Sequence, residues 1–224
     1  MSGVYLCVLV EGRTELNFAK NVLAPYLASS RVWVHPQQVL TSRARRGRPA
    51  YRGGLSSYAR TRSDLQVWMR QRASDQVRFS TIFDLYGLPK DFPGLTAAPP
   101  EPYARVGAIE AAMAKDIDDA RLIPYVQLHE FEALVLADVN RLGEEYFEHS
   151  RALQSLASDL LSLNPELIND SPNTAPSKRI LASIPEYNKS GTGVDLVKSI
   201  GVDALRKRCR HFGAWVTKLE DLGR

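Results

Sequence analysis

Four apolar segments alternate with helix-like stretches in the first part of the chain, and this alternation constrains the fold more than any other feature. The first segment, VYLCVLV at residues 4–10, is continuous and rich in strand-forming residues, which is typical of a strand buried on both faces. We expect further strands at residues 32–40, 77–83 and 122–128, with helices between them. The pattern predicts an α/β fold with a mainly parallel four-stranded sheet flanked by helices.

The strand pattern stops near residue 140, and helical patterns cover residues 150–221. We therefore predict an α/β core over residues 1–140, with a basic loop and helix at 43–72, and a helical C-terminal part over 141–224 packed on it. The 224 residues are 44% hydrophobic and 24% charged, which excludes disorder of the whole chain. Because no apolar run reaches the roughly 18 residues of a membrane span and no leader pattern is visible, we expect no membrane association and a cytoplasmic location.

Residues 43–72 hold the excess positive charge. Nine arginines face one acid, Asp64, so this window carries +8, and the rest of the +4 chain carries −4. Arginine binds phosphate bidentately, and the aromatic residues of the window, Tyr51, Tyr58 and Trp68, could stack on unpaired bases. We expect contact with nucleic acid, with an acidic protein as the alternative partner. The arginines expected to make this contact are Arg43, Arg45, Arg46, Arg48, Arg52, Arg60 and Arg62.

An acidic residue follows three of the four expected strands: Glu11, Asp84 and Glu130. Because the carboxyl ends of parallel strands meet at one edge of the sheet, these carboxylates could meet at one point. Their repulsion would raise their pKa values unless a cation is bound, and oxygen ligands suit Mg²⁺ or Mn²⁺. Glu15 and Glu132 are further candidate ligands. For each acid the alternative is a solvated residue or a helix cap, and Thr14 is the expected cap of the first helix.

Three segments that follow expected strands, VEGRTELNF, FDLYGLPKDFPG and HEFEALVLAD, resemble the TOPRIM-like family catalogued as domain of unknown function 4276. The segments NDSPNTAPSKRI and CRHFGAWVTKL also fit that family, so the resemblance covers nearly the whole chain. It implies a TOPRIM-like, Rossmann-like fold and kinship with metal-dependent TOPRIM nucleases. Members often lie beside genes for AAA or ABC-type ATPases in bacterial defence islands, which implies a nuclease subunit with an ATPase partner.

The resemblance also implies roles for individual residues. In TOPRIM proteins the glutamate after the first strand, here Glu11, acts in acid-base chemistry or binds metal. A later strand ends in Asp-x-Asp, which reads Asp84-Leu85-Tyr86 here, so only Asp84 carries over and the number of metal ions stays open. Glu130 could replace the missing ligand, and Asp91 is a weaker substitute.

The leading hypothesis is hydrolysis of phosphodiester bonds in DNA or RNA, with Glu11, Asp84 and Glu130 holding Mg²⁺ or Mn²⁺. Lys178, at an expected helix start where a cation opposes the helix dipole, is a candidate to neutralise the scissile phosphate; the alternative is a solvated residue. His129 either orients Glu130 or satisfies a backbone carbonyl. Two other functions stay open: a non-catalytic subunit that binds nucleic acid or the ATPase on a degenerate TOPRIM scaffold, and a small-molecule phosphohydrolase. Assembly into a homo-oligomer also stays open.

Overall fold

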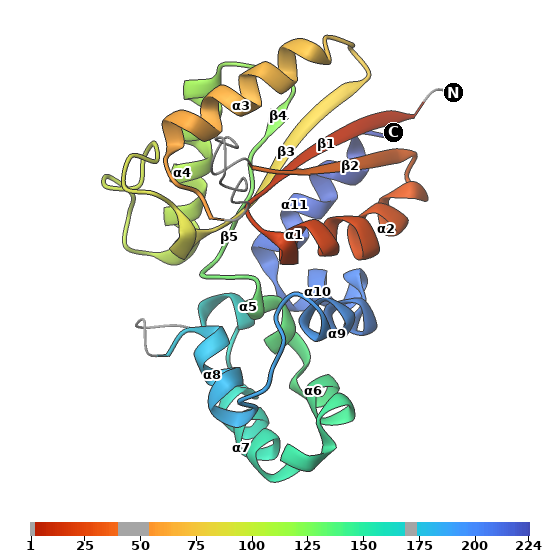
Figure 1. Cartoon of the computed structure of the whole chain (residues 1–224), viewed down its shortest axis with the longest axis vertical. Coiled ribbons are helices and arrows are strands. Elements are labelled where there is room, and N and C mark those ends of the chain that lie inside the picture. The colour runs from red at the N-terminus through yellow and green to blue at the C-terminus, as the bar shows by residue number, and fades with distance from the viewer. Residues whose placement is uncertain (1–2, 40–53, 169–173) are drawn as a thin grey trace, which may run out of the picture.

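The computed structural model describes residues 3–39, 54–168 and 174–224, and a parallel sheet forms its centre (Figure 1). The strand order is β2-β1-β3-β4, and β5 also pairs with β3. Every strand pair among the described residues is parallel, which confirms the expected α/β class. The strands are β1 (Val4–Val10), β2 (Val32–Gln38), β3 (Val77–Asp84), β4 (Leu122–Ile123) and β5 (Val126–Gln127).

The fourth expected strand, residues 122–128, is divided into β4 and β5 by Pro124 and Tyr125. Proline has no amide hydrogen to donate to a strand ladder. A side chain of β3 replaces the ladder here: Tyr125 N–H donates to Thr81 Oγ1 at 2.9 Å, and the Tyr125 carbonyl accepts from that hydroxyl at 2.9 Å. Pairing resumes in β5, so the chain still delivers the next residues to the carboxyl end of the sheet.

Helices cover both faces of the sheet. Leu6 and Val8 of β1 belong to one hydrophobic core and Cys7 and Leu9 to another, so β1 is buried on both faces. Figure 1 shows α3 and α4 on one face and α1, α2 and α11 on the other. These helices are α1 (Arg13–Phe18), α2 (Ala24–Ala28), α3 (Tyr58–Gln71), α4 (Pro102–Ile117) and α11 (Arg210–Asp221), and a π-helical segment (Ala19–Leu23) joins α1 to α2.

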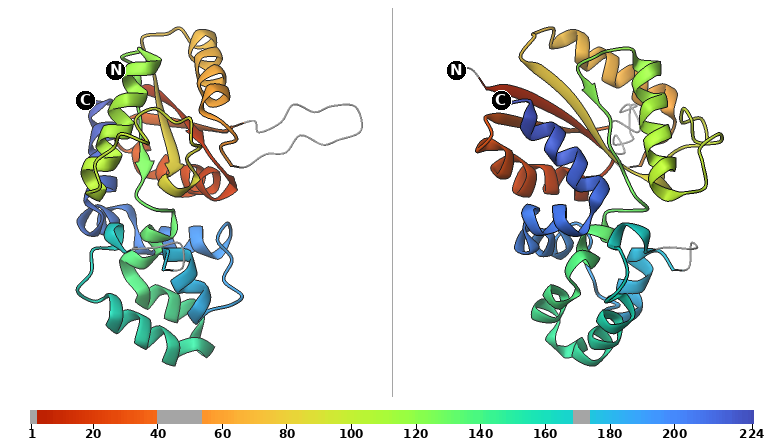
Figure 2. Two further views of the ribbon diagram at one scale, coloured as in Figure 1. Left: turned by 90° about the vertical axis from the view of Figure 1, so that its left-hand side faces the viewer. Right: turned by 180° about the vertical axis from the view of Figure 1, so that it is seen from behind.

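The other helices gather beyond the carboxyl end of β5 (Figures 1 and 2). They are α5 (Glu132–Val135), α6 (Val139–Glu145), α7 (Ser150–Leu160), α8 (Pro176–Ser183), α9 (Thr192–Ile200) and α10 (Val202–Arg208). One hydrophobic core runs from Leu6 and Val8 of β1 to Leu153 and Leu156 of α7, so this helical part packs on the sheet. The boundary at residue 140 stays a prediction. None of the helices in the described ranges combines the length and apolar character that crossing a bilayer requires.

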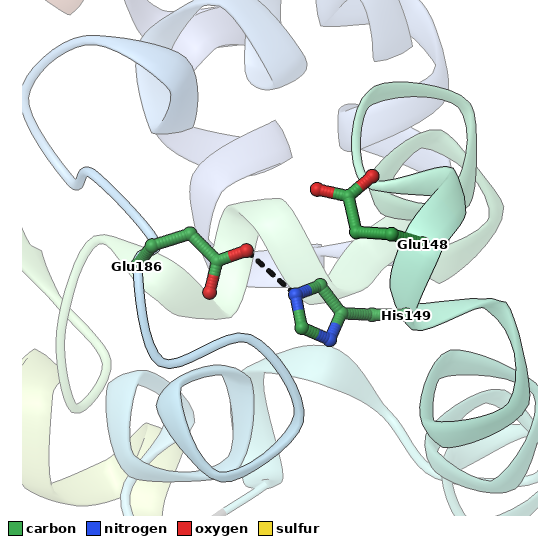
Figure 3. Close-up of side chains that lie close together, drawn as sticks. All are labelled: Glu148, His149 and Glu186. Atoms are coloured by element: carbon green, nitrogen blue, oxygen red, sulfur yellow. Dashed lines mark hydrogen bonds and ion pairs between the residues drawn. The ribbon is translucent and has the colours of Figure 1, made fainter.

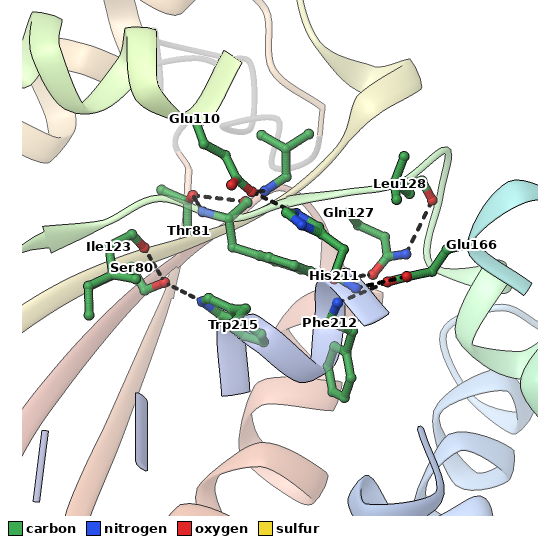
Figure 4. A network of polar contacts seen from close by, with 12 residues as sticks. Ser80, Thr81, Glu110, Ile123, Gln127, Leu128, Glu166, His211, Phe212 and Trp215 are labelled. Carbon is green, nitrogen blue, oxygen red and sulfur yellow. Dashed lines mark hydrogen bonds and ion pairs between the residues drawn. The ribbon is translucent and has the colours of Figure 1, made fainter. Parts of the chain in front are cut away.

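A buried polar network holds α11 against the sheet (Figure 4). Glu166, which has no exposed surface, accepts hydrogen bonds from the backbone N–H groups of His211 and Phe212, both at 2.9 Å. These amides lie in the first turn of α11, where N–H groups have no partner within the helix. Farther along α11, Trp215 Nε1 donates to Ser80 Oγ of β3 at 2.9 Å. The network therefore fixes the helical part relative to β3, the strand that ends at Asp84.

Candidate functional site

The carboxyl ends of β1 and β3 bring Glu11 and Asp84 together. The two strands are neighbours, with Val10 opposite Ile82, and Asp84 N–H donates to Glu11 Oε2 at 3.3 Å. The turn after Asp84 passes close to the same carboxylate: a Cβ on Gly87 would lie 2.5 Å from Glu11 Oε1. A side chain at position 87 would therefore displace the Glu11 carboxylate from this place.

Glu15 lies in the first turn of α1 and is 4% exposed. Its Oε2 accepts a hydrogen bond from Gly12 N–H at 2.8 Å, so Gly12 is the N-cap and the expected cap at Thr14 is wrong. The helix begins earlier than expected because a glutamate at the third helical position satisfies the backbone amide of the cap. Glu15 also faces the acids of the site, since the charges of Asp84 and Glu11 act on it.

His129, Glu130 and Glu132 follow β5 and form another side of the site. His129 has φ of 62°, a left-handed conformation that is strained for a residue other than glycine. Glu130 Oε1 accepts from Ser177 N–H at 2.6 Å, so this carboxylate holds the start of α8. Glu132 lies in the first turn of α5 and has no exposed surface. The structure thus gathers all five predicted acids around the end of the sheet.

Lys189, between α8 and α9, is a cation of this site that the sequence analysis missed. Its Nζ lies 2.9 Å from Glu132 Oε2 and 3.4 Å from Asp84 Oδ2. Lys178, the cation that was predicted instead, is exposed on α8. The segment EYNKSGTG gives no signal for such a role by itself. The signal available was indirect, because several acids expected at one point require a counter-ion.

Burial and mutual repulsion change the protonation of these acids. Burial, reinforced by the charge of Asp84, raises the pKa of Glu11 and that of Glu15 from 4.5 to about 7. Burial also raises the pKa of Glu132 to about 7 and raises the pKa of Asp84, although Lys189 opposes both effects. Burial lowers the pKa of Lys189, but the carboxylates of Asp84 and Glu132 outweigh it, so that pKa is raised overall. At neutral pH Glu11, Glu15 and Glu132 are therefore only partly ionised unless another cation is present.

Two carboxylate oxygens of this cluster are poorly satisfied. Asp84 Oδ1 and Glu132 Oε1 are buried and have no well-formed hydrogen bond among the described residues, although the backbone N–H of Phe131 acts on the Asp84 carboxylate and lowers its pKa. A buried acceptor without a partner is destabilising, so these atoms are available to a ligand. The oxygen-only donor set fits Mg²⁺ or Mn²⁺. The residues that could hold such an ion are Glu11, Glu15, Asp84, Glu130 and Glu132.

A second acidic cluster, Glu148, His149 and Glu186, lies on the helical part (Figure 3). Within residues 3–39, 54–168 and 174–224, it is the one group of three acidic, histidine or cysteine side chains whose ligand atoms lie within 4.8 Å of one another. His149 Nε2 and Glu186 Oε1 are 2.6 Å apart, and both glutamates are exposed. No three of the described acids around Asp84 have ligand atoms within 4.8 Å of one another. Two of these acids, Asp84 and Glu132, contact Lys189 Nζ instead.

Tyr86 and Asp91 lie outside the acid cluster. Tyr86, at the position of the second acid of Asp-x-Asp, is 49% exposed, and its ring centre lies 5.4 Å from that of His129. Asp91 Oδ1 accepts from Tyr58 N–H at 2.9 Å and Asp91 Oδ2 from Ala59 N–H at 3.3 Å. These bonds at the start of α3 lower the pKa of Asp91. The carboxylate of Asp91 therefore serves as a helix cap.

The described residues include only part of the arginine window. Arg43, Arg45, Arg46, Arg48 and Arg52 lie outside the described residues. Arg62 Nε lies 2.7 Å from Asp116 Oδ2, and Arg60 is half-buried in the first turn of α3. Tyr58 and Trp68 are 6% and 5% exposed, so the suggestion that these two rings stack on bases is wrong. Their rings pack in the core below α3, edge-on to Phe92 and Phe79 respectively.

The chain was compared with solved structures, curated proteins and family models. Among solved structures, the chain is similar to the C-terminal region of the OLD protein of Xanthomonas campestris pv. campestris, with 15% identity and a TM-score of 0.42 over 97% of this chain and 95% of that one. None of the curated proteins compared with the chain matches it. The model of the family described as Domain of unknown function (DUF4276) matches residues 10–220, a range that includes all five acids and Lys189. This chain belongs to the DUF4276 family.

Proposed function

We propose that this chain hydrolyses phosphodiester bonds of nucleic acid with a divalent metal ion held by the acids around Asp84. The observation that carries the proposal is the cluster of Glu11, Asp84 and Glu132 with raised pKa values at the carboxyl end of a parallel sheet. Ligands of open α/β sheets bind at this edge. Carboxylates with perturbed pKa values in such a place mark a candidate active site.

The charge balance of the cluster supports a metal ion. When all five acids are ionised, Lys189 neutralises one negative charge and leaves four, which buried carboxylates hold only with a further counter-ion. The open oxygens of Asp84 and Glu132 supply donors of the type that Mg²⁺ and Mn²⁺ favour. When bound, such an ion supplies Lewis-acid charge to phosphoryl oxygens.

The side chains of the protein supply proton transfer and fixed charge. A carboxylate with a pKa of about 7 exchanges protons readily at neutral pH, so Glu11 and Glu15 are suited to accept a proton from an attacking water. Lys189 remains an ammonium and can pair with a phosphate oxygen as a point charge. Glu130 holds the start of α8, the helix that precedes Lys189, and so positions that cation.

The proposal names a substrate and a partner on the basis of the sequence. The excess of arginines over residues 43–72 favours a polyanion such as DNA or RNA. The family resemblance extends the proposal to the effector subunit of a bacterial anti-phage system that works with an AAA or ABC-type ATPase.

Cleavage assays on plasmid DNA, single-stranded DNA and transfer RNA test this function. Each substrate is incubated with Mg²⁺, Mn²⁺ or EDTA, with and without an AAA or ABC-type ATPase encoded beside the gene, where there is one. We expect metal-dependent cleavage that Glu11→Gln slows by at least ~100-fold, because the variant cannot accept a proton. Glu148→Gln, in the surface cluster, is the matched control and leaves the rate unchanged. Cleavage at the full rate in EDTA, or in both Glu11→Gln and Asp84→Asn, would refute the proposal.

A non-catalytic binding subunit is the second candidate function. It is favoured by Tyr86 at the position of the second acid and by the ammonium of Lys189 between Asp84 and Glu132, where it can replace a metal as counter-ion. Titration with Mn²⁺ distinguishes the two functions. If no Mn²⁺ binds at millimolar concentration, the binding subunit is the better account.

A further inference from the structure

Part of the sheet face that carries α3 and α4 is exposed and aromatic. Tyr5 of β1 and Trp33 of β2 are opposite each other in the sheet, and each is 46% exposed. The ring centre of His35, two residues along β2, lies 5.7 Å from that of Tyr5. Trp33, His35 and Gln37 alternate with more buried residues, so the whole of this side of β2 is open. The hydrophobic core on this face explains why: α3 and α4 pack on β1 and β3, and no residue of β2 belongs to that core.

These rings are unusual in the context of this chain. The other two tryptophans, Trp68 and Trp215, are only 5% and 3% exposed. Large aromatic side chains that are gathered on an open surface mark an interaction site more often than a packing accident. Scattered single residues would not support this conclusion, but Tyr5, Trp33 and His35 occupy adjoining positions of two paired strands.

Positive charge borders the same surface. The guanidinium of Arg72, an exposed residue at the end of α3, lies 5.6 Å over the ring of Trp68. Arg72 ends α3 five residues before β3 begins at Val77, and Val77 is opposite Tyr5 in the sheet. The chain therefore brings Arg72 to the end of the sheet at which Tyr5 lies.

Two acids near this end of α3 act on a second cation: Asp119 pairs with Arg121 at 2.7 Å, and Asp75 also acts on Arg121. The surface made of Tyr5, Trp33, His35 and Arg72 therefore combines exposed rings with a positive border.

We infer that this surface binds single-stranded nucleic acid by base stacking, an inference that rests on the proposed function and specifies its substrate. Aromatic rings stack on unpaired bases of any sequence, and arginine pairs with the phosphates that link them. A duplex has no free base faces along its length, so it cannot use the rings in this way. A second copy of the chain fits less well, because Pro36 has no N–H to donate to an added strand and two Arg72 side chains would repel each other.

The open part of this face runs along β2 toward the acid cluster, because β2 ends at Gln38, whose Nε2 lies 3.5 Å from the Glu11 carbonyl oxygen. Tyr5 precedes Glu11 by six residues, which corresponds to about 20 Å of extended strand. A single strand that lies along the open part of this face can therefore reach the acids within a few nucleotides. The rings bind the substrate, and the acids at the other end of β1 carry out the cleavage.

Fluorescence anisotropy in EDTA tests the inference without any cleavage. Labelled thymidine and uridine oligomers of about 15 nucleotides are compared with a duplex of the same length at about 0.1 M salt. We expect tighter binding of the single strands, and Trp33→Ala weakens it by about 5- to 100-fold, whereas Trp33→Phe keeps a ring and retains most of the affinity. Phe147→Ala is the matched control, because Phe147 is 76% exposed in the helical part, and its affinity stays at the wild-type value.

Tryptophan emission gives a second readout, because Trp33 is the exposed tryptophan of the three. Single strands quench this emission in the wild type and not in Trp33→Phe. Equal affinity of wild type and Trp33→Ala overturns the inference. If the wild-type protein is a dimer or larger assembly and Trp33→Ala makes it a monomer with unchanged affinity for the labelled oligonucleotides, the surface binds a second copy of the chain. That result also overturns the inference. If the wild type does not bind single strands through this surface but still cleaves with a metal ion, the inference is wrong and the proposed function stands. If the wild type binds single strands as expected but cleaves none of the substrates, only the proposed function is contradicted.

Discussion

Two acidic clusters in this molecule differ in how their charges are stabilised. Glu148, His149 and Glu186 lie close together at the surface, where a backbone hydrogen bond and the contact with His149 lower the pKa of Glu186. The acids around Asp84 are farther apart, and burial raises the pKa values of Glu11, Glu15, Asp84 and Glu132. Close spacing of ligand atoms is therefore a weaker indication of function here than the free energy stored in buried, partly uncompensated charge.

The difference predicts a pH dependence of stability that belongs to the buried cluster. Glu11, Glu15 and Glu132 have a pKa of about 7 in the folded protein and 4.5 as the ordinary value, so the folded state binds more protons in this interval. The free energy of unfolding of the metal-free protein should fall as pH rises from about 5 to about 8, by on the order of 2 to 3 kcal/mol for each carboxyl. Urea unfolding in EDTA at several pH values measures this slope.

The surface cluster supplies the control for that slope. Because the pKa of Glu186 is lowered in the folded protein, its ionised carboxylate stabilises the fold at every pH above the ordinary pKa of glutamate, and this stabilisation is lost only in acid. Glu186→Gln should therefore leave the slope between pH 5 and pH 8 unchanged. Saturating Mg²⁺ should flatten the slope in the wild type, because the ion binds the ionised acids. A free energy of unfolding that rises with pH over this range would show that the buried acids are not destabilised.

Substitution of Lys189 should change the free energy of unfolding by less than the pH change does. Lys189→Met removes the cation beside Asp84 and Glu132, and the free energy of unfolding in EDTA should fall by about 2 kcal/mol. This is less than for a fully buried pair, because the Lys189 side chain is 37% exposed. Mg²⁺ should restore more stability to this variant than to the wild type. Lys178→Met, exposed on α8, is the control, and an equal loss in both variants would contradict the role given to Lys189.

Local patterns in the sequence predicted the parts of the site that depend on strand order alone. The continuous apolar run of β1 indicates burial on both faces, and such strands lie side by side in a parallel sheet. Glu11 and Asp84 follow strands of this kind, so their closeness results from the topology. The family match over residues 10–220 confirms the DUF4276 family, which the motifs indicated.

The parts that could not be predicted depend on contacts between distant segments. Lys189 and Asp84 are 105 residues apart in sequence, and no pattern around the lysine indicates its partners. The division of the fourth strand depends on the Thr81 hydroxyl, which replaces ladder bonds at Tyr125. Asp91 resembles a spare metal ligand in the sequence, but the start of α3 lies against it and uses its carboxylate.

Mn²⁺ binding, followed by electron paramagnetic resonance in the intact chain, tests most directly whether the buried acids hold a metal ion. The wild type should bind Mn²⁺, Asp84→Asn should weaken that binding by at least about tenfold, and Glu148→Gln should bind as the wild type does. Binding that survives Asp84→Asn and is lost in Glu148→Gln would place the ion at the surface cluster and contradict the proposed site.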